Sequence, residues 1–320
     1  MRLFLANRMD LRLIWLNTPH SKGCRINLVI ASQVQPSRVE RHMLKNLLVN
    51  IPTERSPRPV IDGAISLATR LQAQLDAVSV GHEIPNMPFL AEGGAAVATI
   101  TKVEHEKALE RARAALDVFE AEARRAGVAY SCRTITELQA EAAAILGATA
   151  RLYDLSVVAQ PEFEGGTFDN TLAQEILFQS GGPVLFMPHT FRGAFDAGRI
   201  GICWDGSRLA ARAVRDAMPL LEQAETITIL TVNESRSVPA DASAAHLVRY
   251  LARLGVPTRI AGVTTETANI QSSILSIAAD ESINLLVMGG YGHSRLKETV
   301  FGGVTREMLE SMTVPTLMSH

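Results

Sequence analysis

The sequence is poor in the residues that mark several specialised protein classes. Only 5% of its 320 residues are aromatic, and its three cysteines, Cys24, Cys132 and Cys203, are far apart. That spacing provides neither a disulfide framework nor the clustered Cys and His residues of a zinc site. Cys132 and Cys203 lie in apolar, strand-like runs, so we expect them to be small core residues. The sequence therefore predicts no metal motif and a reducing compartment, the cytoplasm.

The chain also lacks a charge excess and a long apolar run. Its formal net charge is −2, and no cluster combines aromatic with basic residues. Binding to nucleic acid or to an anionic membrane surface normally needs such a basic footprint. No run approaches the roughly 20 apolar residues that span a bilayer. We therefore expect no nucleic-acid partner and no membrane contact.

What the sequence does contain is enough apolar material for sizeable cores. Hydrophobic residues make up 47% of the chain and charged residues 20%, which is typical of soluble globular proteins. A length of 320 residues is sufficient for two domains of ordinary size.

Residues 1–42 differ from the rest because they show no sustained periodicity. They are rich in arginine and poor in acidic residues, and the apolar run Leu11–Leu16 is interrupted by Arg12. That run is too short for a secretory signal, while an arginine-rich start is also found in organellar transit peptides. The favoured interpretation is an N-terminal extension, either disordered or the product of a mis-assigned start. The folded protein is then expected to open at Met43.

From Met43 onward, strand-like and helix-like segments alternate. The predicted strands are 44–51, 75–80, 128–135, 155–159, 184–187, 201–204, 227–232, 256–263, 285–288 and 316–318. The predicted helices are 57–71, 97–126, 138–152, 171–179, 207–221, 242–254, 270–278 and 303–312. Alternating strands and helices favour parallel sheets covered by helices on both faces. The fold class is therefore α/β, with two doubly wound parallel five-stranded sheets in tandem, over 43–188 and 198–320, joined by a linker.

A glycine-rich stretch follows the fourth strand of the second half. Gly289 and Gly290 end the apolar strand, and Gly302 and Gly303 begin the next helix. The loop between them is polar and contains Gly292, His293, Ser294 and Arg295. Glycines let a backbone approach a ligand closely, and a helix start offers free N–H groups at its positive dipole end. The pattern is that of an anion cradle, with a plain turn as the alternative.

The spacing Gly289-x2-Gly292-x9-Gly302, followed by Val304 and Thr305, resembles the glycine motif of ATP-binding universal stress proteins. The resemblance extends over residues 43–320 and implies a tandem member of that family, with a Rossmann-like fold of the adenine nucleotide alpha hydrolase type. It also implies that ATP or AMP is the ligand. The implied nucleotide-binding residues are Asp205, Val232, Met288, Gly289, Gly292, Gly302, Gly303, Val304 and Thr305, with His293 and Ser294 facing the phosphates.

Two places depart from the family pattern. Nucleotide-binding members usually carry Ser or Thr directly after the third glycine, where this chain has Gly303, so one hydroxyl donor to phosphate is lost. The first half departs further, because no aspartate follows its first strand and its fourth strand leads into Gln160-Pro161-Glu162. Proline lacks an N–H donor and the carboxylates of this loop would repel phosphate. We therefore expect a degenerate glycine loop in 43–188 and nucleotide only in 198–320.

No catalytic constellation accompanies these motifs. A Walker lysine loop, a Ser/His/Asp set and an HExxH motif are all missing from the sequence. We expect a binding and sensing role in the stress response and no enzyme activity beyond slow ATP hydrolysis. The alternative is a structural stress module that binds no nucleotide and acts through protein contacts. The resemblance also implies that the final strands, 184–187 and 316–318, meet in an intramolecular pseudo-dimer, and it leaves room for a homodimer.

Overall fold

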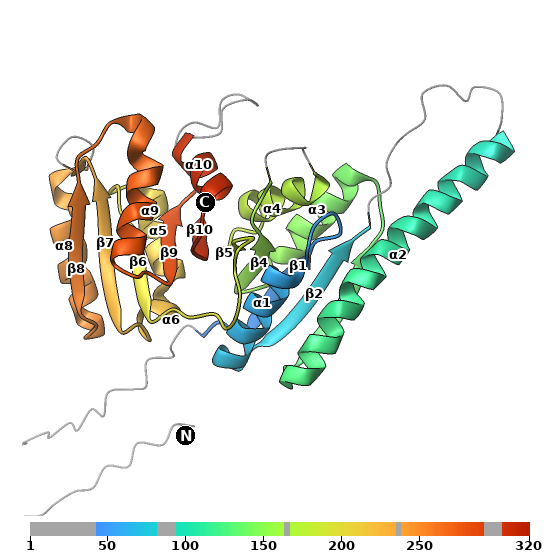
Figure 1. The fold of residues 1–320 in the computed structure, drawn as a ribbon, viewed down its shortest axis with the longest axis horizontal. Helices are drawn as coiled ribbons and strands as arrows, with labels where there is room; N and C mark the ends of the chain where they lie inside the picture. The colour runs from blue at the N-terminus through green and yellow to red at the C-terminus, as the bar shows by residue number, and fades with distance from the viewer. Residues whose placement is uncertain (1–42, 82–93, 163–166, 235–237, 291–302) are drawn as a thin grey trace, which may run out of the picture. The chain divides into compact units, whose positions relative to one another are not determined.

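The structure is a computed structural model that describes residues 43–81, 94–162, 167–234, 238–290 and 303–320. The extension predicted over residues 1–42 lies outside the described residues. Figure 1 shows the elements of the described part along the chain.

The first half contains five strands and four helices in strict alternation. They are β1 (Asn46–Ile51), α1 (Arg58–Leu71), β2 (Gln74–Val80), α2 (Gly94–Ala126), β3 (Tyr130–Ile135), α3 (Gln139–Ala150), β4 (Leu155–Ala159), α4 (Phe168–Gln179) and β5 (Val184–Met187). The long helix α2 ends where the sequence predicts, because Gly127 follows it with a φ of +67°, a conformation that favours glycine. Its buried stripe includes Ala108, Ala112, Leu116 and Phe119. Leu109, although apolar, is only half-buried.

The second half repeats this alternation with shorter helical pieces. Its elements are β6 (Arg199–Cys203), α5 (Arg208–Asp216), α6 (Met218–Leu221), β7 (Thr226–Val232), η1 (Ala240–Ala242), α8 (Ala244–Leu251), η2 (Ala252–Leu254), β8 (Thr258–Val263), η3 (Thr267–Asn269), α9 (Ile270–Asp280), β9 (Leu285–Gly289), α10 (Gly303–Ser311) and β10 (Thr316–Ser319). The predicted helix over 207–221 is thus divided into α5 and α6, where Pro219 occupies the first turn of α6.

All ten strands belong to one sheet, in the order β3-β2-β1-β4-β5-β10-β9-β6-β7-β8. Within each half every pairing is parallel, which confirms the predicted doubly wound α/β class. The two five-stranded sheets are joined by β5 and β10, which pair antiparallel with Leu317 opposite Leu185. The final strands of the halves therefore meet, and each covers the edge that the other would expose.

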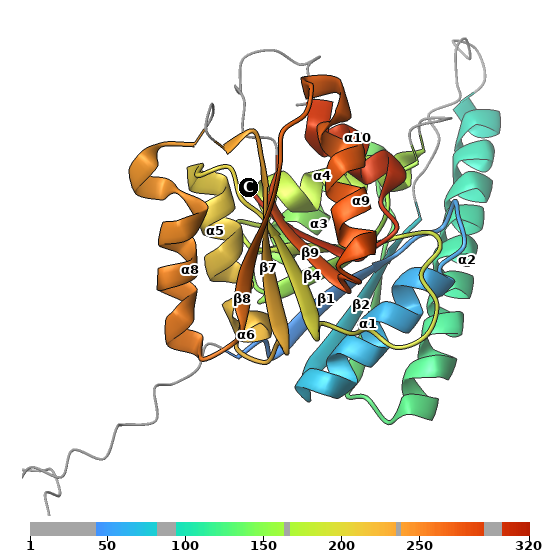
Figure 2. The same ribbon diagram turned by 60° about the vertical axis from the view of Figure 1, so that its left-hand side comes forward.

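Helices cover both faces of the sheet, and each face has its own apolar core. One core is formed with α1, α2, α5 and α8 and includes Ile61, Phe119 and Val214. The other is formed with α3, α4, α9 and α10 and includes Ile176 and Met308. Figure 2 shows α9 and α10 packed beside each other on the strands of the second half. Among the described residues, no helix is long and apolar enough to cross a membrane.

Cys132 and Cys203 are free thiols that pack, partly buried, against one core each. Burial raises the pKa of both thiols to about 12, with Glu120 adding to the effect at Cys132 and Asp205 at Cys203. Both are therefore protonated at neutral pH and serve as small packing residues, as the sequence predicts.

Candidate functional site

The topology of the second half defines where a ligand is expected. β6 is paired with β9 on one side and β7 on the other, so the chain reverses its direction of growth between β6 and β9. Doubly wound sheets bind ligands in the crevice outside the carboxyl ends of such strands. In this half those ends are followed by Asp205 after β6 and Gly290 after β9. Of the residues implied by the family resemblance, Asp205 and Gly289 therefore lie at the switch point of the sheet.

Asp205 is held in a fixed turn at this edge. Its Oδ1 accepts a hydrogen bond of 2.9 Å from the Ser207 backbone N–H, and the Ser207 hydroxyl accepts one of 3.1 Å from Ala210 N–H. Ser207 is thus the N-cap of α5, as predicted. Gly206 between them has a φ of +70° and lies against Val238 and Pro239. The Asp205 carboxylate is exposed, so the turn presents a rigid acceptor to solvent.

Gly289 has a packing role that the glycine motif alone does not reveal. A Cβ at this position would lie 2.7 Å from the Ala210 nitrogen and 2.7 Å from the Leu209 carbonyl carbon, both in the backbone of α5. Contacts this short are not tolerated, so the helix can approach the strand only because residue 289 has no side chain. The next residue, Gly290, donates its backbone N–H to the carbonyl oxygen of Ser319 in β10 at 2.9 Å.

The remaining predicted residues lie on β7 and β9, at the start of α10, or outside the described residues. Val232 ends β7 and is half-buried, while Met288 is buried in β9, both on strands beside the switch point. Gly303 is exposed at the start of α10, followed by half-buried Val304 and buried Thr305. The other predicted residues, Gly292, His293, Ser294 and Gly302, lie outside the described residues.

The equivalent edge of the first half is filled by the protein's own side chains. Arg55, which follows β1, is buried there and donates hydrogen bonds to the carbonyl oxygen of Gln160 and, at 2.8 Å, to Oδ1 of Asn170. Its Nε lies 3.6 Å from Oδ2 of Asp169, and the two side chains are only 5% and 4% exposed. An ion pair thus occupies the space between the ends of β1 and β4.

Two carboxylates of the first half also satisfy the backbone donors that an anionic ligand would need. Glu54 Oε2 accepts the Asp169 backbone N–H in the first turn of α4 at 3.0 Å. In return, Asp169 Oδ2 accepts the Glu54 N–H at 2.9 Å and Oδ1 accepts the Thr53 N–H at 3.4 Å. Burial raises the pKa of Asp169, although these N–H groups and Arg55 act in the opposite direction. The helix start that would attract phosphate is therefore already paired with a carboxylate.

Gln160 connects this filled edge to the second half. Its buried side chain donates from Nε2 to the carbonyl oxygens of Leu309 at 2.8 Å and Glu310 at 3.1 Å, in the last turn of α10. Its Oε1 accepts the His189 N–H at 3.0 Å. The last carbonyls of a helix have no partner within the helix, so Gln160 caps α10 from the other half of the chain.

The sequence predicts a degenerate first half but gives no indication of the side chains that fill its edge. That prediction rests on Pro161 and the carboxylates of the following loop, whereas the structure adds Glu54, Arg55 and Asp169. An acidic residue near the start of α4 is a common helix signal, and a single arginine after a strand gives no signal of its own. Among the described residues, no group of three or more His, Cys, Asp or Glu side chains is arranged to hold a metal ion.

Comparisons with known proteins agree with this arrangement. Residues 197–320 match the Universal stress protein family. A universal stress protein from Archaeoglobus fulgidus DSM 4304 has a similar structure, with a TM-score of 0.66 at 14% identity, covering 87% of this chain and 97% of that one. A putative universal stress protein from Pseudomonas aeruginosa UCBPP-PA14 gives a TM-score of 0.52 at 14% identity, covering 86% of this chain and 93% of that one. No curated protein matches the chain.

The two structural matches span both halves of the chain, while the family match is confined to the second half. The two halves share one topology, but in the first half Arg55 and Asp169 occupy the edge at the switch point. The chain is a tandem of two halves with the universal stress protein fold, of which residues 197–320 match the universal stress protein family.

Proposed function

We propose that the protein is a stress-response binding protein that takes up one adenine nucleotide, ATP or AMP, at the switch point of its second half. In this proposal Asp205 accepts a hydrogen bond from the adenosine end of the ligand. Val232 and Met288 lie against the base, and the start of α10 at Gly303 receives the phosphates. The role is binding and sensing in the cytoplasm, with slow hydrolysis at most.

The observation that carries the proposal is the contrast between the two halves at the same topological position. In the second half, the Asp205 carboxylate is exposed in a fixed turn, and Gly303 is exposed at the start of α10. In the first half, Arg55 and Asp169 fill the corresponding space, and Glu54 pairs with the first turn of α4. A nucleotide would have to displace a buried ion pair there, which costs several kcal/mol. We therefore expect one nucleotide per chain.

Calorimetric titration of the full chain with ATP and AMP tests this. Asp205→Asn keeps an oxygen for the Ser207 N–H and so preserves the turn, but it removes the charge and should weaken binding. Gly303→Ser should tighten binding about fivefold, about 1 kcal/mol, by restoring a hydroxyl donor. The serine fits within the described part of the chain, where a Cβ at position 303 would meet only Glu307 Oε1, at 3.7 Å.

Gly182→Ser is the matched control for the glycine substitution. A Cβ at position 182 would meet only the Tyr153 carbonyl oxygen, at 3.7 Å, and the residue lies in the first half, so affinity should not change. A stoichiometry near two would contradict the idea that the first half is filled. If neither the wild type nor Gly303→Ser binds either nucleotide, the nucleotide proposal fails and the structural stress module remains.

A further inference from the structure

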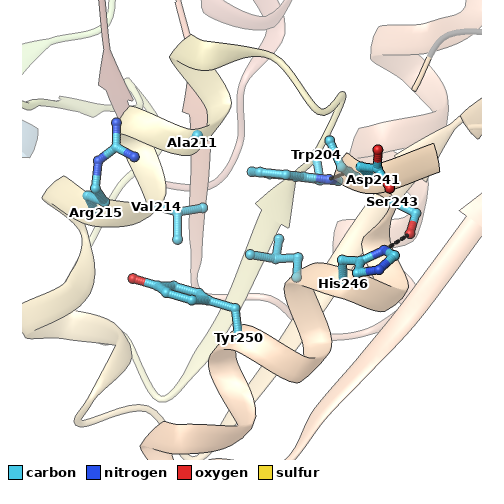
Figure 3. A pocket seen from close by; sticks show the side chains of 10 residues that line it. Trp204, Ala211, Val214, Arg215, Asp241, Ser243, His246 and Tyr250 are labelled. Atoms are coloured by element: carbon cyan, nitrogen blue, oxygen red, sulfur yellow. Dashed lines mark hydrogen bonds between the residues drawn. The ribbon is translucent and has the colours of Figure 1, made fainter. Parts of the chain in front are cut away.

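A second candidate binding site lies between α5 and α8 and is lined on one side by Trp204. It is a cavity of about 320 Å³, at the small end of the range for ligand pockets. Figure 3 shows Trp204 on one side and Tyr250 on the other, with Val214 from α5 between them. Nothing in the proposed nucleotide site requires this cavity, so it stands apart from the proposed function.

Two aromatic residues line the cavity, and one of them, Trp204, is held in place. The Trp204 indole N–H donates a 2.7 Å hydrogen bond to the Ala242 carbonyl oxygen, so its polar atom is satisfied and the ring is held in place. Val214 and Leu247, which are 2% and 6% exposed, line the cavity with apolar surface. Tyr250 is 46% exposed although it is a large aromatic residue. A planar ring placed against Trp204 and Tyr250 would bury their apolar surface.

The charges at the cavity favour an anionic group on that ring. Arg215 lines one end, and the Tyr250 hydroxyl points toward the same side in Figure 3. Among the described residues the Arg215 guanidinium has no ion pair or hydrogen bond, whereas the Arg212 side chain on the same helix pairs with Asp216. At the other end, the Nδ1 of His246 is already engaged with the Ser243 hydroxyl at 2.8 Å, and Asp241 would repel an anion. The Asp241 charge and the engaged nitrogen of His246 disfavour a carboxylate at that end, so we expect the carboxylate at Arg215.

We propose that the cavity between α5 and α8 binds a small planar aromatic carboxylate, with its ring against Trp204 and Tyr250 and its carboxylate at Arg215. A ring with one carboxylate suits a cavity of this size, and a guanidinium is well suited to carboxylate geometry.

Benzoate is the probe, and Trp204 is the reporter. The chain has two tryptophans, and Trp15→Phe leaves Trp204 as the single one in the full chain. Benzoate should change the Trp204 emission with a saturable curve in the range of about 1 mM, as expected for so small a ligand. Benzamide has the same ring without the charge, and cyclohexanecarboxylate has the charge without the aromatic ring. Both should bind more weakly.

Arg215→Gln should lower the benzoate affinity about tenfold, because a charge-assisted hydrogen bond is lost, and should leave the benzamide affinity unchanged. Arg253→Gln, an exposed arginine of η2 that does not line the cavity, is the matched control and should change neither. The proposal is overturned if benzoate produces no saturable change up to about ten times the expected range. It is also overturned if benzoate and benzamide bind equally, or if Arg215→Gln and Arg253→Gln behave alike.

Discussion

Replacing Gln160 should destabilise the protein through α10, a helix that lies almost 150 residues further along the chain. Gln160→Met keeps the length and most of the volume of the side chain but removes its amide. The substitution leaves three backbone groups without their present partner, namely the carbonyls of Leu309 and Glu310 and the N–H of His189. The bond to Leu309 is buried, and the side chain of Gln160 as a whole is only 3% exposed, so water cannot fully replace the amide.

The magnitude follows from the cost of unpaired polar groups. A hydrogen bond contributes about 1 kcal/mol net, and a buried group left without a partner costs about 1–3 kcal/mol. One buried and two partly buried bonds therefore predict a loss of about 2–4 kcal/mol in the free energy of unfolding. Gln179→Met is the matched control, because Gln179 is exposed on α4 and its side-chain amide makes no hydrogen bond among the described residues. Its effect should stay within about 0.5 kcal/mol.

Urea unfolding gives the free energy, and hydrogen exchange locates the effect. In Gln160→Met, the backbone amides of α10 should exchange faster, whereas those of α8, which Gln160 does not contact, should keep their protection. Gln160→Glu should be at least as harmful, because it places a carboxylate against two carbonyl oxygens. If Gln160→Met matches the Gln179→Met control in stability and α10 keeps its protection, the capping role assigned to Gln160 is wrong.

Three further predictions concern groups whose environment the structure defines. Since the pKa of Cys132 and of Cys203 is about 12, a Cys24→Ser protein should not react with Ellman's reagent at pH 8 until it is unfolded, and early labelling would contradict this. The pKa of Asp169 is raised in the folded state, so its stabilising contribution is present at low pH and is lost as pH rises through that pKa. In urea unfolding from pH 4 to 7, the difference in free energy of unfolding between wild type and Asp169→Asn should therefore shrink. A difference that grows with pH would mean that the attraction of Arg55 outweighs burial. Gly289→Ala should lower the free energy of unfolding by about 1–3 kcal/mol, because its Cβ would push α5 away from β9. Gly290→Ala is the control and should melt near the wild-type temperature, since its Cβ would first meet Leu177 at 3.5 Å. Equal melting temperatures of the two variants would refute the packing role of Gly289.

The fold could be predicted from the sequence because every element has a local cause. Runs such as Leu155–Ala159 are apolar and β-branched, and helices end at glycines such as Gly127 and Gly255, which adopt positive φ. The division of the helix at Met218 was missed, although Pro219 is compatible with a new first turn. Polarity alone is also a poor guide to burial within α2, where apolar Leu109 is only half-buried because of its position on the helix.

The site could be predicted only in part, since its decisive contacts join residues that are distant in sequence. Nothing near Arg55 indicates that its guanidinium will reach Asn170, or that Glu54 will accept an N–H from α4. Gly289 was assigned to ligand approach, yet the structure gives it a packing role that depends on Leu209 and Ala210. Such tertiary contacts leave no periodic trace in the sequence, whereas a motif with fixed spacing does.

The two halves therefore use one topology in different ways, and the difference has a physical logic. A helix start needs a negative partner, and the first half supplies it internally through Glu54, which makes an anionic ligand unnecessary there. Arg55 also lies at this edge and donates a hydrogen bond to the carbonyl oxygen of Gln160. The side chain of Gln160 in turn caps α10. The residues that fill the first-half edge therefore also support a helix of the second half. A variant that empties the first-half edge should on this reasoning loosen α10 even though it changes no residue of the second half.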